Sequence, residues 1–286
     1  MRHASAEITL CSTAMGVRNL GLWIVVSSST ACGFGVDWDA FARSSNGGPP
    51  HPADAAAAPV IDAGATYADA VRASRPIAYY RFEEDDGAPV SSDITGAPSG
   101  VTEDDARHVV GRVGRGIHLD GAGGDRVSFG DAFTLLLDRD RSFSVEVLVE
   151  VERLNADYAR IFSLEAVGDS TISGTTVFAR ANELAFQRND ATGRSSMFTK
   201  RAPLPLGAFV HLVASCDERS CRLVIDGVAT EPAAPGVSAP PNQGPFSLGA
   251  RSKNANNVLG VFDELAIYDH ALTDAEIAAH RAALPR

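Results

Sequence analysis

The chain has 286 residues, of which 45% are hydrophobic, 21% charged and 7% aromatic. These values are typical of a globular protein with a buried core and exclude a largely disordered chain. Lys and Arg number 25 against 36 Asp and Glu, which gives a formal net charge of −11. The sequence contains no cluster of basic residues, so we expect no nucleic-acid partner.

Residues 1–31 are predicted to be a signal peptide. Arg18 precedes the apolar run Leu20–Val26, and small residues lead up to Cys32. The apolar run is far shorter than the roughly 18 to 20 residues of a membrane-spanning helix, so no transmembrane anchor is expected. The pattern resembles a bacterial lipoprotein signal with a lipid on Cys32, although Ser29 stands where such signals usually carry an aliphatic residue. An ordinary secretory signal cleaved near Ala31 is the alternative.

Met15 would give a compact leader, and we expect translation to begin there. Residues 32–66 are rich in Ala, Pro, Gly and Ser without periodicity, which predicts a flexible tether. A lipid on Cys32 would hold the protein at the bacterial cell envelope, on the outer membrane and cell surface or in the periplasm. Without the lipid the protein would be secreted. Membrane contact is expected through the lipid alone.

Residues 67–286 are predicted to form one all-β domain. Short alternating segments are separated by Gly, Pro, Asn and Asp, as in Ser142–Val151, Phe209–Ala214, Arg222–Ile225 and Val258–Tyr268. Many short strands with turn signals between them indicate a two-sheet sandwich or jelly roll.

Two short peripheral helices are also predicted. Tyr67–Ser74 is weakly helical and ends before Pro76. A capping box from Thr273 to Glu276 opens a helix over Ala275–Ala283.

Several blocks in this domain carry a family resemblance. They include Pro76–Glu84, Gly116–Gly121, Phe143–Val147 and Gly260–Ile277. Together they resemble a bacterial LamG-like jelly roll of the concanavalin A-like lectin and glucanase superfamily. The resemblance implies two antiparallel sheets packed face to face, with recognition by loops at the rim of the concave sheet. Members bind glycans or proteins, so the fold does not name the ligand.

The predicted rim loops are Gly168–Thr175, Arg188–Ser196 and Arg251–Asn257. Their polar side chains suit hydrogen bonding to sugar hydroxyls, but Phe198 is the one aromatic residue close by, and polar loops are common in any sandwich. The candidate ligand-binding residues are Asn189, Asp190, Arg194, Asn254, Asn256 and Asn257. We expect a non-enzymatic envelope module that binds a carbohydrate or a surface protein.

The resemblance also implies one structural calcium ion. Glu84, Asp93 and Asp263 would supply the hard oxygen ligands that calcium prefers. The alternative is that Glu84 belongs to an exposed acidic turn and that Asp263 accepts hydrogen bonds from the backbone.

A glycoside hydrolase is the alternative function, and a structural surface protein without a small ligand is another. Glu146, Glu150 and Glu152 project to one face of a predicted strand, but Leu148 replaces the central Asp of the glucanase pattern. Retaining glycosidases need two carboxyl groups about 5 to 5.5 Å apart, which Glu146 and Glu150 could supply. We expect no enzyme and no catalytic residues.

Two further residue types have structural interpretations. Cys216 and Cys221 separate two strand-like segments and are predicted to form a disulfide. A metal site is less favoured, because no second Cys pair or His lies at a suitable spacing. His211 alternates with apolar residues and is predicted to be buried and hydrogen-bonded.

Overall fold

The computed structural model describes residues 66–122, 124–134, 141–154, 157–167, 172–190, 192–199, 201–235, 244–251 and 256–285. The chain divides into two units, residues 1–49 and 50–286, and every described residue belongs to the second unit. The predicted signal peptide, Cys32, most of the tether and Asn254 lie outside the described residues. No helix in the described ranges is long and apolar enough to cross a membrane.

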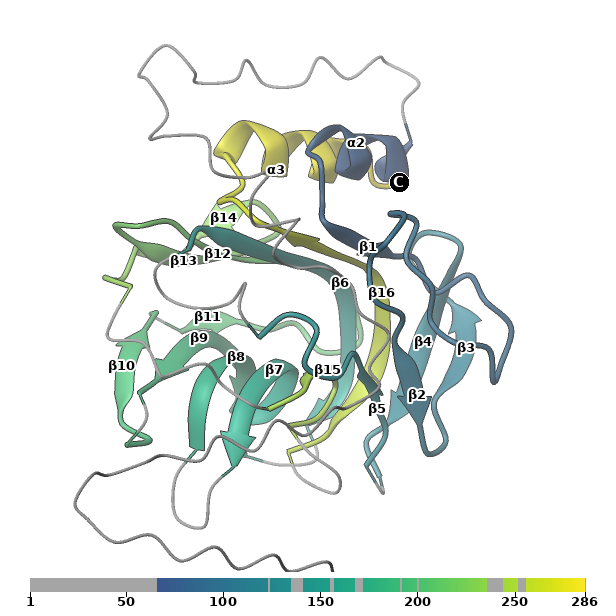
Figure 1. The fold of residues 1–286 in the computed structure, drawn as a ribbon, viewed down its shortest axis with the longest axis horizontal. Coiled ribbons are helices and arrows are strands. Elements are labelled where there is room, and N and C mark those ends of the chain that lie inside the picture. The colour runs from purple at the N-terminus through teal and green to yellow at the C-terminus, as the bar shows by residue number, and fades with distance from the viewer. Residues whose placement is uncertain are drawn as a thin grey trace, which may run out of the picture. The chain divides into compact units, whose positions relative to one another are not determined.

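Strands dominate the described part of the chain, with one short helix at each end (Figure 1). In chain order the elements are α2 (Tyr67–Ala73), β1 (Ala78–Tyr80), β2 (Val101–Glu103), β3 (Arg107–Val110), β4 (Arg115–Asp120), β5 (Arg126–Ser128), β6 (Phe143–Leu154), β7 (Ala159–Val167), β8 (Ile172–Arg180), β9 (Glu183–Asn189), β10 (Ser195–Phe198), β11 (Ala202–Pro203), β12 (Phe209–Cys216), β13 (Cys221–Ile225), β14 (Val228–Ala229), β15 (Phe246–Leu248), β16 (Val258–Tyr268) and α3 (Asp274–Ala282).

The described strands form two eight-stranded antiparallel sheets. The first, which we call the helix-side sheet, has the order β14-β13-β12-β6-β16-β4-β3, with β1 also paired to β16. The second, which we call the opposite sheet, has the order β10-β9-β8-β7-β15-β5-β2, with β11 also paired to β9. The main hydrophobic core draws side chains from both sheets. The predicted all-β, two-sheet antiparallel sandwich is confirmed.

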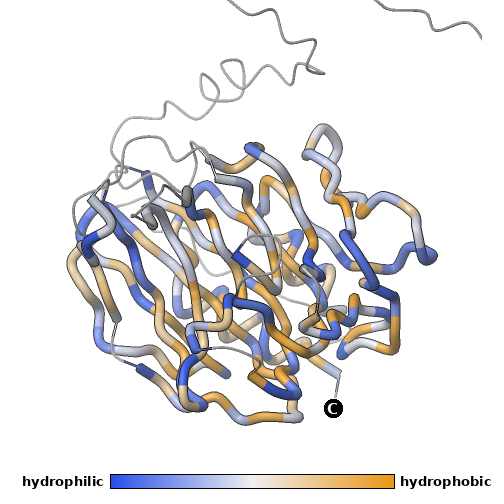
Figure 2. Tube along the Cα trace, turned by 90° about the horizontal axis from the view of Figure 1, so that it is seen from below, coloured by the Kyte–Doolittle hydropathy of each residue, from blue (hydrophilic) through white to orange (hydrophobic). Residues whose placement is uncertain are grey.

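Period-two alternation explains why these segments are strands. In β6, Val145, Val147 and Val149 belong to the core between the sheets, whereas Leu148 belongs to a second cluster beneath the helices. Successive side chains of a strand point to opposite faces of its sheet, so one pattern serves both layers. Hydrophobic and hydrophilic positions accordingly alternate along several strands (Figure 2).

The two helices lie together over the helix-side sheet (Figure 1). Each begins with a capping box, from Thr66 to Asp69 in α2 and from Thr273 to Glu276 in α3. The second hydrophobic cluster joins the helices to the sheet; it contains Tyr67, Ala68, Val71 and Ile277 from the helices and Tyr79, Leu148, Val213, Val224, Ala266 and Tyr268 from strands. The two predicted peripheral helices are confirmed, and both pack on one face of the sandwich.

The hairpin between β12 and β13 carries a disulfide, as predicted. Cys216 and Cys221 are directly paired in the strand register, their Cα atoms are 4.0 Å apart, and their sulfur atoms are bonded. Both residues are buried in the main core.

A bulge interrupts β16 at the point where its neighbour changes. Up to Phe262 the strand pairs with β4, and from Leu265 it pairs with β1. The register of β16 against β6 shifts between Asp263 and Ala266, and Glu264 has a φ of 52°. A bulge re-aims side chains, and here it leaves two acidic residues, Asp263 and Glu264, fully buried.

Candidate functional site

Glu146 of β6 is a buried carboxylate beneath the two helices. It accepts hydrogen bonds from the hydroxyls of Tyr67 (2.9 Å) and Tyr268 (2.7 Å), from His211 Nε2 (2.5 Å) and from His280 Nδ1 (3.0 Å). Burial alone would raise the pKa of Glu146, but His280 and His211 hold that pKa well below its usual value. The carboxylate is therefore ionised and saturated with donors. The prediction that His211 is buried and hydrogen-bonded is confirmed.

The surroundings of Glu146 differ from those of the other two glutamates of β6. Glu150 is partly exposed, and Glu152 lies 3.1 Å from Nε2 of His118. A glycosidase nucleophile must touch the sugar, whereas the Glu146 side chain has no exposed surface. Glu146 and Glu150 therefore do not form an accessible catalytic pair.

Two of the carboxylates predicted to bind calcium are engaged elsewhere. Asp93 Oδ2 lies 2.5 Å from a guanidinium nitrogen of Arg72. Glu84 Oε1 accepts a hydrogen bond from the Ser91 amide (2.6 Å), while its Oε2 lies 3.9 Å from His108 Nε2 and has no hydrogen-bond partner. Across the described residues no group of three or more His, Cys, Asp or Glu is placed to hold a metal ion.

Asp263, the third predicted calcium ligand, lies at the β16 bulge. Its Oδ2 accepts a hydrogen bond from the Val113 amide (2.8 Å), and its Oδ1 is buried without a partner. Burial raises the pKa of Asp263 to about 8 and that of Glu264 to about 7. The Tyr79 hydroxyl and the Arg81 guanidinium, whose Nε lies 3.1 Å from Oε1, hold the Glu264 carboxylate. Calcium stays a prediction.

The outer face of the opposite sheet carries a strip of aromatic rings, which we call the aromatic face. It consists of Tyr158 before β7, Phe178 in β8 and Phe198 in β10. The ring centroids are 5.2 Å apart for Tyr158 and Phe178, and 6.0 Å apart for Phe178 and Phe198. Phe178 is buried, whereas Tyr158 is 38% exposed and Phe198 is 42% exposed. Two rings at this surface are therefore accessible to a ligand.

Arginines stack on these rings. The guanidinium of Arg180 lies 4.5 Å from the Tyr158 ring centre, and that of Arg201 lies 6.0 Å from the Phe198 ring centre. Arg180 also donates to the Tyr158 hydroxyl (2.5 Å), and Arg201 lies 3.5 Å from Glu183 Oε2. A guanidinium has five N–H groups, so each arginine keeps further donors beside its ring. The face therefore combines apolar ring surface with planar hydrogen-bond donors.

A row of polar side chains crosses the opposite sheet beside Phe198. The strand register places Gln187 opposite Phe198, Thr176 opposite Gln187, Ser163 opposite Thr176, and Ser247 opposite Ser163. The neighbouring residues in each strand belong to the core, so by alternation this row faces outward. Ser163, Thr176 and Ser247 are nevertheless fully buried, and their hydroxyls donate to Glu165, Phe162 and Ala250. Gln187 is the partly exposed member of the row, beside Phe198.

A buried ion pair lies beside this row. Arg160 donates from Nε to Glu165 Oε2 (2.7 Å) and from a second nitrogen to Oε1 (3.0 Å), and its guanidinium lies over the Phe178 ring. Arg251 lies within electrostatic range of both charges, and burial lowers its pKa. Arg251 Nε and Asn257 Oδ1 are buried without partners. Unpaired buried polar atoms are uncommon in folded proteins, and this end of the sheet holds one unpaired donor, Arg251 Nε, and one unpaired acceptor, Asn257 Oδ1.

The predicted loop residues lie at two ends of the opposite sheet. The strand register pairs Asn189 with Gly174, and Gly174 with Glu165 of β7. At the other end of β7, the Asn256 carbonyl accepts a hydrogen bond from the Arg160 amide (2.8 Å). Five residues of β7 separate these levels, which is about 15 Å along the strand. The structure therefore brings Asn256 and Asn257 to the Arg160 end and leaves Asn189, with Asp190 and Arg194, at the other.

Most of these loop side chains serve local structure. Asp190 Oδ1 accepts hydrogen bonds from the amides of Thr192 (2.8 Å) and Arg194 (3.0 Å) and so closes its own turn. Asn256 donates to the Asp157 carbonyl (2.9 Å), and Asn189 accepts from Gln187 (2.7 Å). Arg194 is exposed.

Sequence reasoning named Phe198 but missed Tyr158 and Phe178. The usable signal was in β8, where the core residue Val177 alternates with Phe178, a ring on the outward face. Tyr158 stands outside the strands with a φ of 61°, and its contact with β8 depends on the tertiary fold.

The described strands define a protein of the two-sheet antiparallel β-sandwich class. The Laminin_G_3 family model, described as the concanavalin A-like lectin/glucanases superfamily, matches residues 120–278, more than half of the chain. The chain belongs to this superfamily. No curated protein matches the chain.

Solved structures share the fold at low sequence identity. The binding domain of Paraclostridial Mosquitocidal Protein 1 is 14% identical with a TM-score of 0.58, and the match covers 71% of this chain and 50% of that one. Domain 4 of AbnA, a GH43 extracellular arabinanase from Geobacillus stearothermophilus, was solved with arabinotriose; it is 19% identical with a TM-score of 0.55, covering 72% and 98%. Trypanosoma rangeli sialidase is 13% identical with a TM-score of 0.55, covering 72% and 32%. This chain thus spans half or less of the mosquitocidal and sialidase chains.

Proposed function

We propose that the protein is a non-enzymatic recognition module that binds carbohydrate through the aromatic face of the opposite sheet. The observation that carries the proposal is the pair of exposed rings, Tyr158 and Phe198, with the partly exposed amide of Gln187 opposite Phe198. Sugar rings present an apolar C–H face and a rim of hydroxyls. An aromatic ring packs against the first, and planar donors and acceptors pair with the second.

The polar groups around the rings suit this ligand class. Gln187 offers an amide beside Phe198, and Arg180 and Arg201 offer guanidinium donors at the two exposed rings. The domain 4 structure solved with arabinotriose has the same fold, which is consistent with a carbohydrate ligand. A surface protein is the second ligand class.

The proposal places the module at the bacterial cell envelope through a lipid on Cys32, with residues 32–66 as tether. Two acyl chains give stable membrane attachment. Mass spectrometry of the protein from a bacterial membrane fraction tests this step. A diacylated Cys32 is expected, with release into the medium after Cys32→Ser. A non-acylated mature protein that begins near Cys32 would instead indicate ordinary secretion.

A glycan-array screen of the purified chain, in calcium and in chelator, tests the ligand class. Binding to a defined group of glycans is the expected result, and calcium dependence would support the predicted calcium ion. An array without signal in either buffer, together with specific capture of one surface protein, would favour the protein ligand. Incubation with a bound glycan followed by product analysis should yield no shorter products, because the proposal includes no catalysis.

A further inference from the structure

Positive charge gathers at the Tyr158 end of the aromatic face, in a chain whose net charge is −11. The guanidinium groups of Arg160 and Arg180 lie over the rings of Phe178 and Tyr158, and Arg251 is close enough to Arg160 for their charges to interact. We propose that this end binds an acidic sugar residue, whose carboxylate pairs with Arg180 in a field that Arg251 strengthens, while its ring packs on Tyr158. The inference rests on the proposed function and names the class of sugar.

Arg180 is the cation placed to meet the ligand. Its guanidinium lies 4.5 Å from the Tyr158 ring centre, and one nitrogen donates to the Tyr158 hydroxyl (2.5 Å). Its counterpart at the other exposed ring, Arg201, has a carboxylate 3.5 Å away in Glu183. Within the described ranges Arg180 has no such ion pair. The two exposed rings therefore differ, because Phe198 lies beside a paired arginine and Tyr158 beside an arginine that lacks a carboxylate.

Arg251 adds a second positive charge that the local carboxylate does not neutralise. Both oxygens of Glu165 are bound by Arg160, at 2.7 and 3.0 Å, and the Ser163 hydroxyl donates to one of them. Arg251 keeps a nitrogen, Nε, that is buried without a partner. Burial lowers the pKa of Arg251, and the opposing effect of Glu165 does not restore it. An added anion nearby would stabilise the charged form of this side chain.

The groups that the ligand would touch are accessible. Tyr158 is 38% exposed, and Arg180 and Arg251 are partly exposed. A uronic acid combines a sugar ring, which has an apolar face, with one carboxylate at its edge. A planar guanidinium binds a carboxylate through two parallel hydrogen bonds, which a neutral hydroxymethyl group cannot match. An acidic sugar therefore uses both the ring and the charge at this end, whereas a neutral sugar uses the ring alone.

The negative charges nearby do not cancel the excess. Asp157, which precedes Tyr158, is exposed, so its charge is screened by solvent. Even with Asp157 counted, three arginines face two carboxylates, Asp157 and Glu165. Inclusion of Arg201 and Glu183 leaves this excess unchanged, since these two form a pair.

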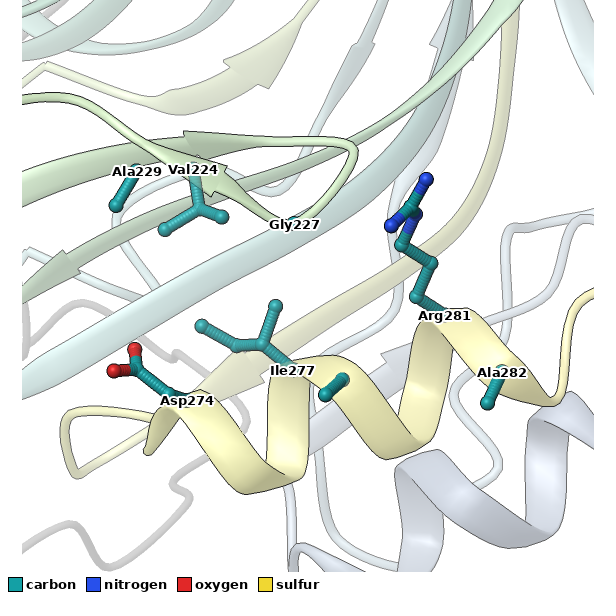
Figure 3. A pocket seen from close by; sticks show the side chains of 8 residues that line it. Val224, Gly227, Ala229, Asp274, Ile277, Arg281 and Ala282 are labelled. Atoms are coloured by element: carbon teal, nitrogen blue, oxygen red, sulfur yellow. The ribbon is translucent and has the colours of Figure 1, made fainter.

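The pocket between α3 and the β13–β14 turn has no comparable excess (Figure 3). Arg281 extends from α3 toward Gly227, and Asp274 lies in the same lining, which is otherwise apolar and includes Val224 and Ile277. One positive and one negative charge leave this pocket neutral. Arg281 therefore serves as the matched control, because it is an exposed arginine away from the aromatic face.

The test uses the full chain and three ligand pairs: trimers of D-glucuronic, D-galacturonic and D-mannuronic acid, each beside its neutral methyl ester. Calorimetry gives each Kd at about 0.05 M and about 0.5 M salt. At low salt at least one acid should bind about tenfold tighter than its ester, because charge-assisted hydrogen bonds replace neutral ones. High salt should reduce this preference, since it screens charges at exposed side chains.

Three variants assign the preference to residues. Arg180→Gln should bring the Kd values of acid and ester within about twofold of each other, and Arg251→Gln should reduce the preference by a smaller factor. Arg281→Gln should keep the full preference. A sulfated galactose trimer, run in parallel, distinguishes a carboxylate from other anions. Tighter binding of this trimer than of all three acids would overturn the carboxylate assignment.

Two results overturn the inference as a whole. One is that no acid binds more tightly than its ester in the native chain, and the other is that Arg180→Gln keeps the preference. In both cases, binding of neutral oligosaccharides that is lost in Phe198→Ala would leave the proposed function standing. If no acid, ester or neutral glycan binds, the proposed function fails together with this inference.

Discussion

Nδ1 of His280 lies 3.0 Å from each carboxylate oxygen of Glu146, and both side chains are fully buried. This contact joins α3 to the central strand β6. On its other side, Nε2 of His280 lies 2.9 Å from the hydroxyl of Ser74, the residue that ends α2. One histidine thereby holds both helices against the helix-side sheet.

Removal of His280 should destabilise the protein strongly. His280→Ala leaves a buried carboxylate without its cationic partner, which typically costs about 3 to 5 kcal/mol. Urea denaturation followed by circular dichroism measures the change in the free energy of unfolding. His270→Ala, at a partly exposed histidine, is the matched control and should change that free energy by less than about 0.5 kcal/mol. Equal stability of the two variants would show that the contact between His280 and Glu146 contributes nothing to the free energy of unfolding.

The same pair predicts a bell-shaped pH dependence of stability. The pKa of His280 is raised because Glu146 outweighs the effect of burial, so its contribution is complete below the usual value of 6.5 and is lost as pH rises through the raised pKa. The pKa of Glu146 is lowered, so its contribution is complete above 4.5 and is lost as pH falls through the lowered pKa. The pair therefore contributes most between these values. We expect a plot of Tm against pH to show this maximum for the native chain and to lack it for His280→Ala.

Asp263 predicts that stability falls as the pH rises. Its pKa rises from 3.8 in the unfolded chain to about 8 in the folded one, so the folded state holds a proton that the unfolded state has released. Stability should fall between these pH values, by at most about 1.4 kcal/mol per unit. Asp263→Asn should flatten the slope, whereas Asp85→Asn, at an exposed aspartate, should keep it. If calcium binds at Asp263, the native slope should also flatten in calcium but not in chelator. An unchanged slope in Asp263→Asn would contradict this assignment.

Loss of the disulfide should cost less than loss of His280. Cys216 and Cys221 are separated by five positions, and the chain-entropy relation gives about 2 kcal/mol for a loop of this length. The double variant Cys216→Ala, Cys221→Ala should lower the urea midpoint accordingly while the fold persists. A midpoint unchanged under oxidising conditions would mean that the bond does not constrain the unfolded chain.

The fold followed from the sequence because its signals are local. Alternation in Phe143–Val151 and the capping box at Thr273 predicted a strand and a helix that the structure contains. The site followed only in part, since it depends on contacts between distant segments. Polar composition pointed to Asn189 and Asn256 alike, but the strand register places them at different ends of one sheet. The partners of Glu146 come from residues 67, 211, 268 and 280, which no spacing rule connects.

The most direct test of the central claim is the affinity of Phe198→Ala for the glycan that binds best on the array. Phe198 is 42% exposed on the aromatic face, and Val110 is an exposed apolar residue of β3 in the other sheet. We expect Phe198→Ala to weaken the Kd by about tenfold, because stacking of a ring on a ligand contributes on the order of 1 kcal/mol or more, and Val110→Ala to leave it unchanged. An unchanged Kd in Phe198→Ala, with the fold intact, would contradict recognition through the aromatic face.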